Sequence, residues 1–215
     1  MTVVIGIAGT MRSGKSTLAK ELALSWDLPI VSFAESLRME VAQAFYPKKQ
    51  RTDARFWWSR LEGIDKTLTR PILQAWGQAK RDFFDEDYWV DRMFDYMKRK
   101  GMDFAICDDV RHENEAQRIL DEGGIIIRLT ADRQTLLDRG ATASQLEHAS
   151  EREDALDDIM GGRENPKNVN CFNLNTSGKS TYGQFVNAQA ILSWTRLHNP
   201  LRERRYGLLP AGEEE

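Results

Sequence analysis

One segment near the N-terminus constrains the fold more than any other part of the chain. Residues 9–16 read GTMRSGKS, which matches the pattern G-x-x-x-x-G-K-[ST] without a mismatch. A short β-branched run, Val3–Ala8, precedes this loop, and a stretch with apolar residues at helical spacing, Thr17–Trp26, follows it. A buried strand, a glycine-bounded loop and an amphipathic helix in this order are typical of a phosphate-binding loop in a parallel sheet.

The residue types in this loop suit the phosphates of a nucleoside triphosphate. The glycines let backbone N–H groups point into the loop, and the start of the helix adds the positive end of its dipole. Lys15 is expected to reach the β- and γ-phosphates, and the Ser16 hydroxyl is expected to complete a Mg²⁺ shell. The predicted ATP-binding residues are Gly9, Met11, Arg12, Ser13, Gly14, Lys15, Ser16 and Thr17.

A second tract, SGKST at residues 177–181, repeats the end of the motif. It has Asn173 where the first glycine is needed, so we interpret it as a loop with a helix N-cap rather than as a phosphate site. Its place after the last expected strand is compatible with a contact to the adenine ring.

Further apolar runs alternate with helical patterns along the rest of the chain. Strands are expected at 29–33, 104–107, 124–129 and 171–174, and helices at 34–46, 53–63, 68–80, 87–100, 112–122, 132–139 and 181–197. This alternation predicts an α/β fold, a five-stranded parallel sheet flanked by helices. The chain of 215 residues suits one domain over 1–200, followed by a tail over 201–215.

Composition excludes several classes of protein. The net charge is -3, which gives no basic surplus to drive non-specific binding to nucleic acid or to a membrane surface. The two cysteines, Cys107 and Cys171, lie in expected strands and are interpreted as reduced core thiols. No Cys/His cluster indicates a zinc site, and no apolar run is long enough to span a membrane. We therefore expect a soluble, cytoplasmic protein.

Acidic residues end the third expected strand, where ligands bind in open α/β sheets. Asp108 is the predicted second Mg²⁺ residue beside Ser16, and Asp109 and Arg111 are predicted to face the substrate in the same crevice. The alternative is a surface turn with solvated charges, since acids also favour turns for their side-chain hydrogen bonds.

Two other regions concentrate arginines. The long insertion at 34–103 contains LQAWGQAKRDFFDEDYWV, whose arginine, glutamine and aromatic residues suit a phosphate clamp and a stacked base. Trp76 is equally compatible with core packing, and Trp57 and Trp58 are interpreted as packing residues. After the fourth strand, Arg128, Arg133 and Arg139 suit a lid over transferring phosphates or, alternatively, a solvated helix surface. His112 and His148 are interpreted as structural.

Together these segments resemble the phage-type deoxynucleoside monophosphate kinases of the P-loop nucleoside monophosphate kinase family. The resemblance rests on the phosphate loop, SFAESLR at 32–38, LQAWGQAKRDFFDEDYWV at 73–90 and DDVRHENEAQRI at 108–119, and covers about residues 3–190. It implies a core at 1–33 and 104–200, a monophosphate-binding insertion at 34–103 and a lid at about 130–155.

The resemblance also implies an activity and a set of site residues. The activity is ATP- and Mg²⁺-dependent phosphorylation of a deoxynucleoside monophosphate to the diphosphate, as a step of deoxynucleotide biosynthesis. Its implied catalytic residues are Lys15, Arg111, Arg133 and Arg139, and its implied substrate-binding residues are Arg38, Arg70, Gln74, Trp76, Arg81, Asp109 and Arg111. The implied partners are ATP and the monophosphate, without nucleic acid or membrane, and the aromatic residues at 56–58 would fit a homodimer contact.

Two rival functions stay open from the sequence. The first is a P-loop kinase of another phosphorylated acceptor, such as phosphomevalonate or dephospho-coenzyme A. The second is a P-loop ATPase module that binds a protein or nucleic acid, for which the basic residues at 48–60 are the nearest available surface. The aromatic-rich insertion favours an acceptor that carries a base, because stacking suits a planar ring.

Overall fold

The computed structural model describes residues 2–45, 66–146, 156–160, 169–195 and 200–201. The chain divides into two compact units. The sheet unit comprises residues 1–30 and 103–215, and the helical unit comprises residues 31–102. The helix expected at 53–63, the tryptophans at 57 and 58 and the basic run at 48–60 lie outside the described residues.

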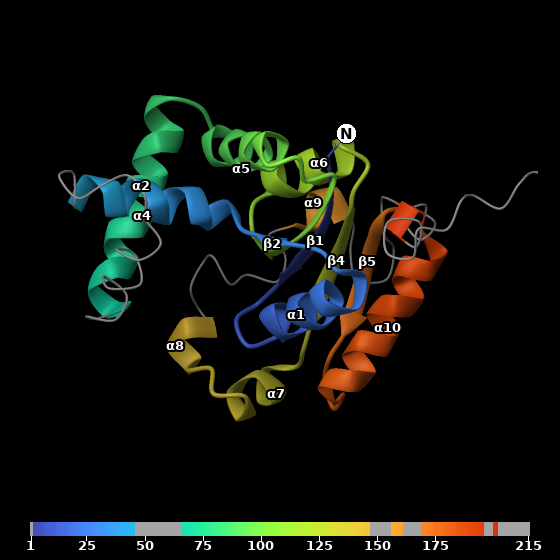
Figure 1. Cartoon of the computed structure of the whole chain (residues 1–215). Helices are drawn as coiled ribbons and strands as arrows, with labels where there is room; N and C mark the ends of the chain where they lie inside the picture. Colours follow the sequence, from blue (N-terminus) through green and yellow to red (C-terminus); the bar gives the residue numbers. More distant parts are fainter. Residues whose placement is uncertain (1, 46–65, 147–155, 161–168, 196–199, 202–215) are drawn as a thin grey trace, which may run out of the picture. The chain divides into compact units, whose positions relative to one another are not determined.

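A five-stranded sheet with the order β2-β3-β1-β4-β5 forms the centre of the sheet unit (Figure 1). Strand β1 pairs in parallel with both β3 and β4, and β4 pairs in parallel with β5. The expected fold class, a five-stranded parallel sheet flanked by helices, is confirmed. The strands are β1 (Val3–Gly9), β2 (Ile30–Val31), β3 (Phe104–Val110), β4 (Ile125–Thr130) and β5 (Cys171–Asn175).

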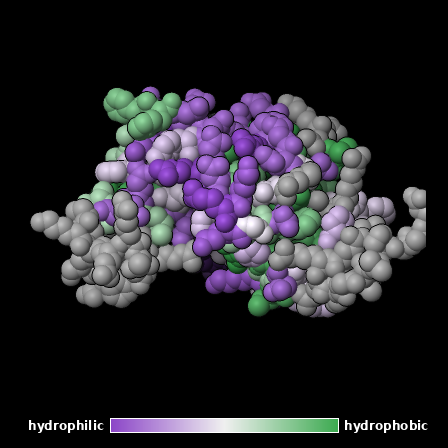
Figure 2. Space-filling model, turned by 45° about the horizontal axis from the view of Figure 1, so that its top comes forward, coloured by the Kyte–Doolittle hydropathy of each residue, from purple (hydrophilic) through white to green (hydrophobic). Residues whose placement is uncertain are grey.

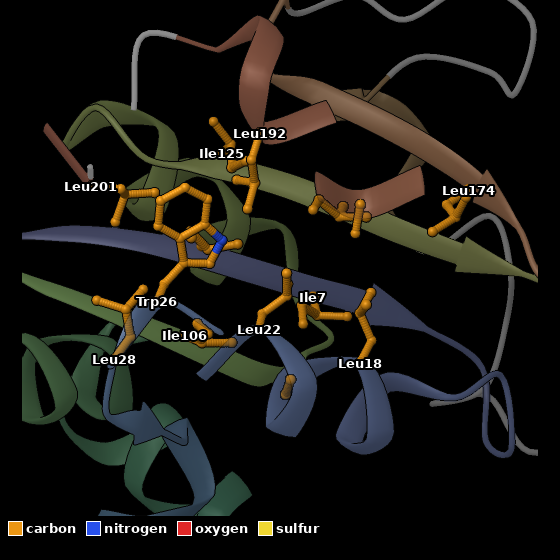
Figure 3. Close-up of a cluster of buried hydrophobic side chains, with 14 of the residues drawn as sticks. Ile7, Leu18, Leu22, Trp26, Leu28, Ile106, Ile125, Leu174, Leu192 and Leu201 are labelled. Carbon is orange, nitrogen blue, oxygen red and sulfur yellow. The ribbon is translucent and has the colours of Figure 1, made fainter. Parts of the chain in front are cut away.

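Alternation along the central strands divides their side chains between two cores. Ile5 and Ile7 of β1 and Ile127 of β4 face the helices α1 (Lys15–Trp26) and α10 (Thr181–Trp194), where Leu18, Leu22 and Leu192 meet them (Figure 3). All six of these side chains are at most 1% exposed. Since burying one such side chain stabilises the fold by roughly 1.5–3 kcal/mol, this face fixes α1 directly behind the phosphate loop.

The opposite face of the sheet is covered by α6 (Glu113–Asp121), with α9 (Asp157–Met160) packed against it. Gly6 permits the close approach, because a Cβ added there would lie 2.7 Å from Ile126 Cδ1 and 3.0 Å from Ile119 Cδ1. Two short helices, α8 (Ala143–Leu146) and α9, were not expected from the sequence, since four residues are too few for a periodic pattern. Helix α7 (Arg133–Asp138) lies within the stretch expected at 132–139.

Two strand boundaries differ from the sequence-based expectation. Strand β2 has only two residues, and Phe33, expected in that strand, already begins α2 (Phe33–Phe45). Strand β3 continues through Asp108 and Asp109 to Val110, so the two acids lie inside the strand rather than after it. Apolar composition ends at Cys107, but the backbone pairing with β1 does not.

The helical unit is built from α2, α4 (Lys66–Phe83) and α5 (Tyr88–Arg99). Val41 and Ala42 of α2 are buried against α4 side chains that include Ile72 and Trp76. The buried indole N–H of Trp89 donates a 3.0 Å hydrogen bond to the carbonyl of Gly77, which ties α5 to the middle of α4. The cost of opening this small core therefore depends on polar contacts as well as on apolar burial.

The surface of the described residues is mostly hydrophilic on the face drawn in Figure 2, with small separate hydrophobic patches. The large apolar side chains with the greatest exposure are Val169, Trp194 and Phe83, and each is more than 80% exposed. Within the described ranges, no helix has the length and apolar character needed to cross a membrane. The two cysteines, Cys107 and Cys171, are free and buried, as expected.

Candidate functional site

The phosphate loop between β1 and α1 has the backbone that its sequence pattern predicts. Gly9, Arg12 and Gly14 have positive φ values of 135°, 63° and 103°. At Gly9 only glycine fits, because an added Cβ would lie 2.3 Å from the carbonyl oxygen of Leu129 on β4. Helix α1 begins at Lys15 with Gly14 as its N-cap, so the first N–H groups of the helix open toward the loop.

The Lys15 ammonium lies across the loop in this structure. Its Nζ donates hydrogen bonds of 2.6 Å to the Gly9 carbonyl and 2.7 Å to the Thr10 carbonyl. Both acceptors are backbone carbonyls of the loop, so the positive charge of Lys15 lies at the loop, where it favours an anion. Ser16 and Thr17 are exposed on the first turn of α1, Met11 is half-buried and Arg12 is exposed.

Two hydroxyls of the loop are buried without a hydrogen-bond partner among the described residues: Thr10 Oγ1 and Ser13 Oγ. The Ser13 side chain is 0% exposed and that of Thr10 is 5% exposed. Leaving a buried hydroxyl unsatisfied costs about 1–3 kcal/mol, so these two groups are a local energetic cost of the loop. Thr10 was not among the residues predicted from the sequence, although it lies within the motif.

A β-bulge places the two acids of β3 beside the start of the loop. Gly6 pairs with Cys107 and Ala8 pairs with Val110, so two residue steps along β1 face three along β3. The additional residue falls at Asp108–Asp109, level with the last residues of β1 before Gly9. Bulges of this kind change the direction of side chains next to active sites. Here both carboxylates are half-buried near the carboxyl ends of the strands, where the phosphate loop also begins.

The Asp109 carboxylate contacts the strand that carries it. Its Oδ1 accepts from the thiol of Cys107 at 3.1 Å. Burial, and then the nearby negative charge of Asp109, raise the pKa of the Cys107 thiol well above its ordinary value. Cys107 is therefore held as a neutral thiol and donates rather than accepts in this contact.

The segment after β3 is fixed by one buried acid. Glu115 Oε2 accepts hydrogen bonds from the backbone N–H groups of Arg111 at 2.8 Å and His112 at 3.0 Å. His112 is the N-cap of α6, which confirms its structural interpretation, whereas His148 lies outside the described residues. The Arg111 side chain is half-buried, and its backbone is held two residues beyond the bulge.

Of the three arginines assigned to the region after β4, only one lies on a solvated helix surface. Arg133 is exposed at the start of α7, where Asp132 forms the N-cap. The Ser177 hydroxyl, followed by the N–H and hydroxyl of Thr135, lowers the pKa of Asp132 to about 2. Arg128 is 3% exposed in β4, pairs with Asp157 and donates to Asn173 at 2.8 Å, which makes it a structural residue.

Arg139 contacts the phosphate loop itself. Its guanidinium donates to the carbonyls of Arg12 and Ser13, both at 3.4 Å, and to the carbonyl of Thr176 at 2.8 Å. Thr176 begins the turn between β5 and α10, and Ser180 in that turn caps α10 by accepting from the Gly183 N–H. The interpretation of SGKST as a loop with an N-cap is confirmed.

In the helical unit, the carboxylate of Glu40 gathers side chains from two neighbouring helices. It accepts from Lys80 Nζ at 2.7 Å, Trp76 Nε1 at 3.1 Å, the Tyr88 hydroxyl at 3.1 Å and Arg92 at 3.4 Å. Burial alone raises the pKa of Glu40, but these hydrogen bonds outweigh it and hold the pKa below its ordinary value. No motif in the sequence marks Glu40.

The other insertion residues that were assigned to the substrate differ in exposure. Arg70 and Gln74 are exposed on α4, and Arg81 is half-buried near the end of the same helix. Arg38 is half-buried on α2, and its Nε is buried with no hydrogen-bond partner in the described part of the chain. These four side chains remain predicted substrate contacts, and Arg38 carries the strongest sign of an absent partner.

Comparison with solved structures finds likenesses of low sequence identity. A gluconokinase from Sinorhizobium meliloti 1021 is 13% identical, with a TM-score of 0.48, over 95% of this chain and 98% of that chain. Shikimate kinase from Aquifex aeolicus vf5 is 14% identical, with a TM-score of 0.45, over 93% of this chain and 99% of that chain. Dephospho-CoA kinase from Campylobacter jejuni is 16% identical, with a TM-score of 0.41, over 92% of this chain and 100% of that chain.

No curated protein matches the chain in sequence. The family model described as an AAA domain (AAA_18) matches residues 5–160, which is more than half of the chain and includes most of β1, the phosphate loop and the bulge of β3. The chain therefore belongs to this AAA domain family of P-loop proteins, in keeping with its phosphate loop on a five-stranded parallel sheet.

Proposed function

We propose that this protein is a P-loop kinase that transfers the γ-phosphoryl group of ATP to a deoxynucleoside monophosphate. The observation that carries the proposal is the phosphate loop. Its backbone has the left-handed residues of a phosphate loop, α1 begins directly behind it, and the Lys15 ammonium lies across it on the carbonyls of Gly9 and Thr10. A triphosphate bound there would pair with Lys15 and with the N–H groups at the start of α1.

The donor side of the proposed reaction rests on the sheet unit. Ser16 and Asp108 would hold Mg²⁺ with the phosphate oxygens, since hydroxyl and carboxylate oxygens are the hard ligands that this ion prefers. The metal supplies neutralisation of the charge that develops on the phosphates. Lys15 and the loop N–H groups orient the β- and γ-phosphates, and Arg111, Arg133 and Arg139 are the proposed cationic side chains around the transferring group.

The acceptor needs no strong general base, because it already carries a phosphate oxyanion. That oxygen attacks the γ-phosphorus, the bond to the β–γ bridging oxygen breaks, and ADP leaves with the electron pair. The chain's task is to align two phosphates and to exclude water. No nucleophile–His–Asp arrangement was found in the sequence, in keeping with this chemistry.

The acceptor is proposed to bind in the helical insertion, over residues 34–103, and a lid is proposed at about 130–155, of which residues 147–155 lie outside the described residues. Its predicted contacts are Arg38, Arg70, Gln74, Trp76, Arg81, Asp109 and Arg111. The Nε of Arg38 has no hydrogen-bond partner among the residues that the structure describes, which supports a phosphate or carboxylate ligand on α2, because a guanidinium matches both with paired hydrogen bonds.

One observation supports a second candidate, a P-loop kinase of another small phosphorylated acceptor. Trp76, the aromatic residue proposed to stack on a base, packs with Val41 and Ala42 and gives its N–H to Glu40. This favours the packing alternative for Trp76 and weakens the argument that the acceptor carries a base. Phosphomevalonate and dephospho-coenzyme A are the acceptors to compare.

An ADP-release screen over deoxynucleoside monophosphates, ribonucleoside monophosphates and these two acceptors tests the proposal. We expect ADP release only with MgATP and a deoxynucleoside monophosphate, and a rate about 10²–10³ lower from Lys15→Ala. Release with another acceptor alone selects the second candidate. Steady ATP hydrolysis that needs no acceptor and rises with DNA would instead identify an ATPase module and overturn both.

A further inference from the structure

The turn after β5 reaches the phosphate loop through one buried side chain, Thr176. Its hydroxyl lies 3.2 Å from the Ser13 carbonyl and 3.1 Å from the Thr130 carbonyl, and it accepts from Arg139 at 3.1 Å. Its backbone N–H donates to the same Thr130 carbonyl at 2.7 Å. Thr176 is 0% exposed, so this hydroxyl joins β4, β5 and the loop inside the protein.

The loop needs such support at one position. Arg12 is in the left-handed region, with φ of 63°, and a residue with a Cβ pays about 1–2 kcal/mol there. Strained residues persist only where the surroundings hold them. The carbonyls of Arg12 and of the next residue, Ser13, are the two loop acceptors that Arg139 contacts, and the second also faces Thr176.

Holding these carbonyls also sets the direction of the neighbouring N–H groups. No cis peptide bond occurs in the described residues, and in a planar trans peptide the C=O and N–H point opposite ways. A Ser13 carbonyl turned toward Thr176 therefore turns the Gly14 N–H away from it. Gly14 is the N-cap of α1, so this N–H belongs to the group that receives a phosphate in loops of this type.

We propose that Thr176 is a positioning residue for the phosphate donor, which acts by fixing the Ser13–Gly14 peptide of the loop. Arg139 is the second member of this contact and brings a positive charge whose observed acceptors are all neutral. The inference rests on the proposed function only in that the loop must bind a nucleoside triphosphate. Neither the acceptor nor phosphoryl transfer enters it.

Two variants of Thr176 isolate the hydroxyl. Thr176→Val replaces it by a methyl group of similar size, and Thr176→Ser keeps it and removes the methyl. Calorimetry measures the Kd of the full-length protein for a non-hydrolysable ATP analogue and for inorganic tripolyphosphate, each with Mg²⁺. We expect Thr176→Val to bind both ligands about three- to tenfold more weakly, which corresponds to one lost hydrogen bond. Thr176→Ser should stay within about twofold of the unchanged protein.

Tripolyphosphate has no base or sugar, so its Kd reports on phosphate binding at the loop alone. A loss for the ATP analogue alone would place the effect of Thr176 on the base or sugar and overturn the proposal. A folded Thr176→Val protein with a lower Tm and unchanged Kd values would show a structural threonine only, and would also overturn it. If Thr176→Val does not fold, Thr176→Ala provides the same comparison with Thr176→Ser.

A double variant tests the partnership with Arg139. Since Arg139 and Thr176 share a hydrogen bond and the Ser13 carbonyl, the effects of Arg139→Gln and Thr176→Val on Kd should not add. Simple multiplication of the two fold-changes would contradict a shared contact. If the unchanged protein binds neither ligand, the proposed function itself is wrong. If the unchanged protein and every variant bind both ligands equally well, only the proposed role of Thr176 is wrong.

Discussion

The indole Nε1 of Trp76 donates a 3.1 Å hydrogen bond to Oε1 of Glu40, the same oxygen that Lys80 approaches at 2.7 Å. Trp76, the tryptophan that the sequence analysis considered for stacking on a base, is thus held along one edge by the carboxylate of Glu40 on α2. Lys80 in turn lies 4.9 Å from the ring centroid of Phe84. The polar network of the helical unit is therefore centred on Glu40, a residue that no motif marks.

Glu40→Gln is expected to lower the free energy of unfolding by about 1–3 kcal/mol, because it removes the charge on which several hydrogen bonds converge. The side chains of Glu40 and Lys80 are only 20% and 24% exposed, so solvent screens the pair incompletely. Glu21→Gln, at an exposed site on α1, is the matched control. Equal denaturation curves for the two variants would show that the Glu40 network contributes nothing measurable.

The stabilisation contributed by Glu40 is expected to depend on pH. The pKa of Glu40 is lower in the folded protein than its ordinary value of 4.5, so its contribution is fully present above about pH 4.5. It is lost as the pH falls through the folded pKa, where the carboxyl becomes protonated. The difference in unfolding free energy between the unchanged protein and Glu40→Gln should therefore shrink below pH 4.5, and a constant difference would argue against the sign of this shift.

Lys15→Ala is expected to lower the rate of phosphoryl transfer by about 10²–10³, since it removes a preorganised charge at the transferring phosphates. Its fold should remain, because the hydrogen bonds from the ammonium to the carbonyls of Gly9 and Thr10 stay within the phosphate loop. Lys20→Ala, exposed on the same helix, should keep full activity. Near-normal turnover by folded Lys15→Ala would remove the phosphate loop from the proposed mechanism.

Asp108→Asn is expected to affect Mg²⁺ binding, and Arg111→Ala is expected to affect acceptor binding. Asp108 lies in the bulge level with the end of β1, whereas Arg111 lies beyond the end of β3. The first variant should raise the Mg²⁺ concentration needed for half-maximal rate, and the second should raise the KM for the acceptor. Separate titrations of Mg²⁺ and acceptor decide this, and the same pattern in both variants would contradict the division of roles.

Arg70→Ala and Arg81→Ala are expected to raise the acceptor KM and leave the Kd for a non-hydrolysable ATP analogue unchanged. Both arginines lie in the helical unit, which does not include the phosphate loop. A guanidinium there can bind the phosphate of the acceptor with paired hydrogen bonds. Arg99→Ala, exposed in the last turn of α5, is the control for loss of a surface charge. An unchanged acceptor KM in both variants would move the acceptor site elsewhere, and a large fall in Tm would favour a structural role.

Periodicity and one loop motif were enough to predict the fold class and the presence of every described strand. Strand β1 is apolar on both faces and the GTMRSGKS loop has glycines at two of its three positive-φ positions, so local residue choice determines this part of the structure. Boundaries were less predictable. Strand β3 continues past its apolar residues because its pairing with β1 resumes at Val110, beyond the bulge that contains Asp108 and Asp109, and pairing is not visible in one strand alone.

The sequence by itself determined the loop, its lysine and the parallel sheet, since each depends on neighbours in the chain. Only the tertiary structure decided that Thr176 and Arg139 contact the loop from 163 and 127 residues away, and that Glu40 binds Trp76 across 36 residues. It also decided that Arg128 is a buried partner of Asp157 rather than a surface charge. These contacts join segments with no shared periodicity or motif, because packing, not sequence spacing, brings their atoms together.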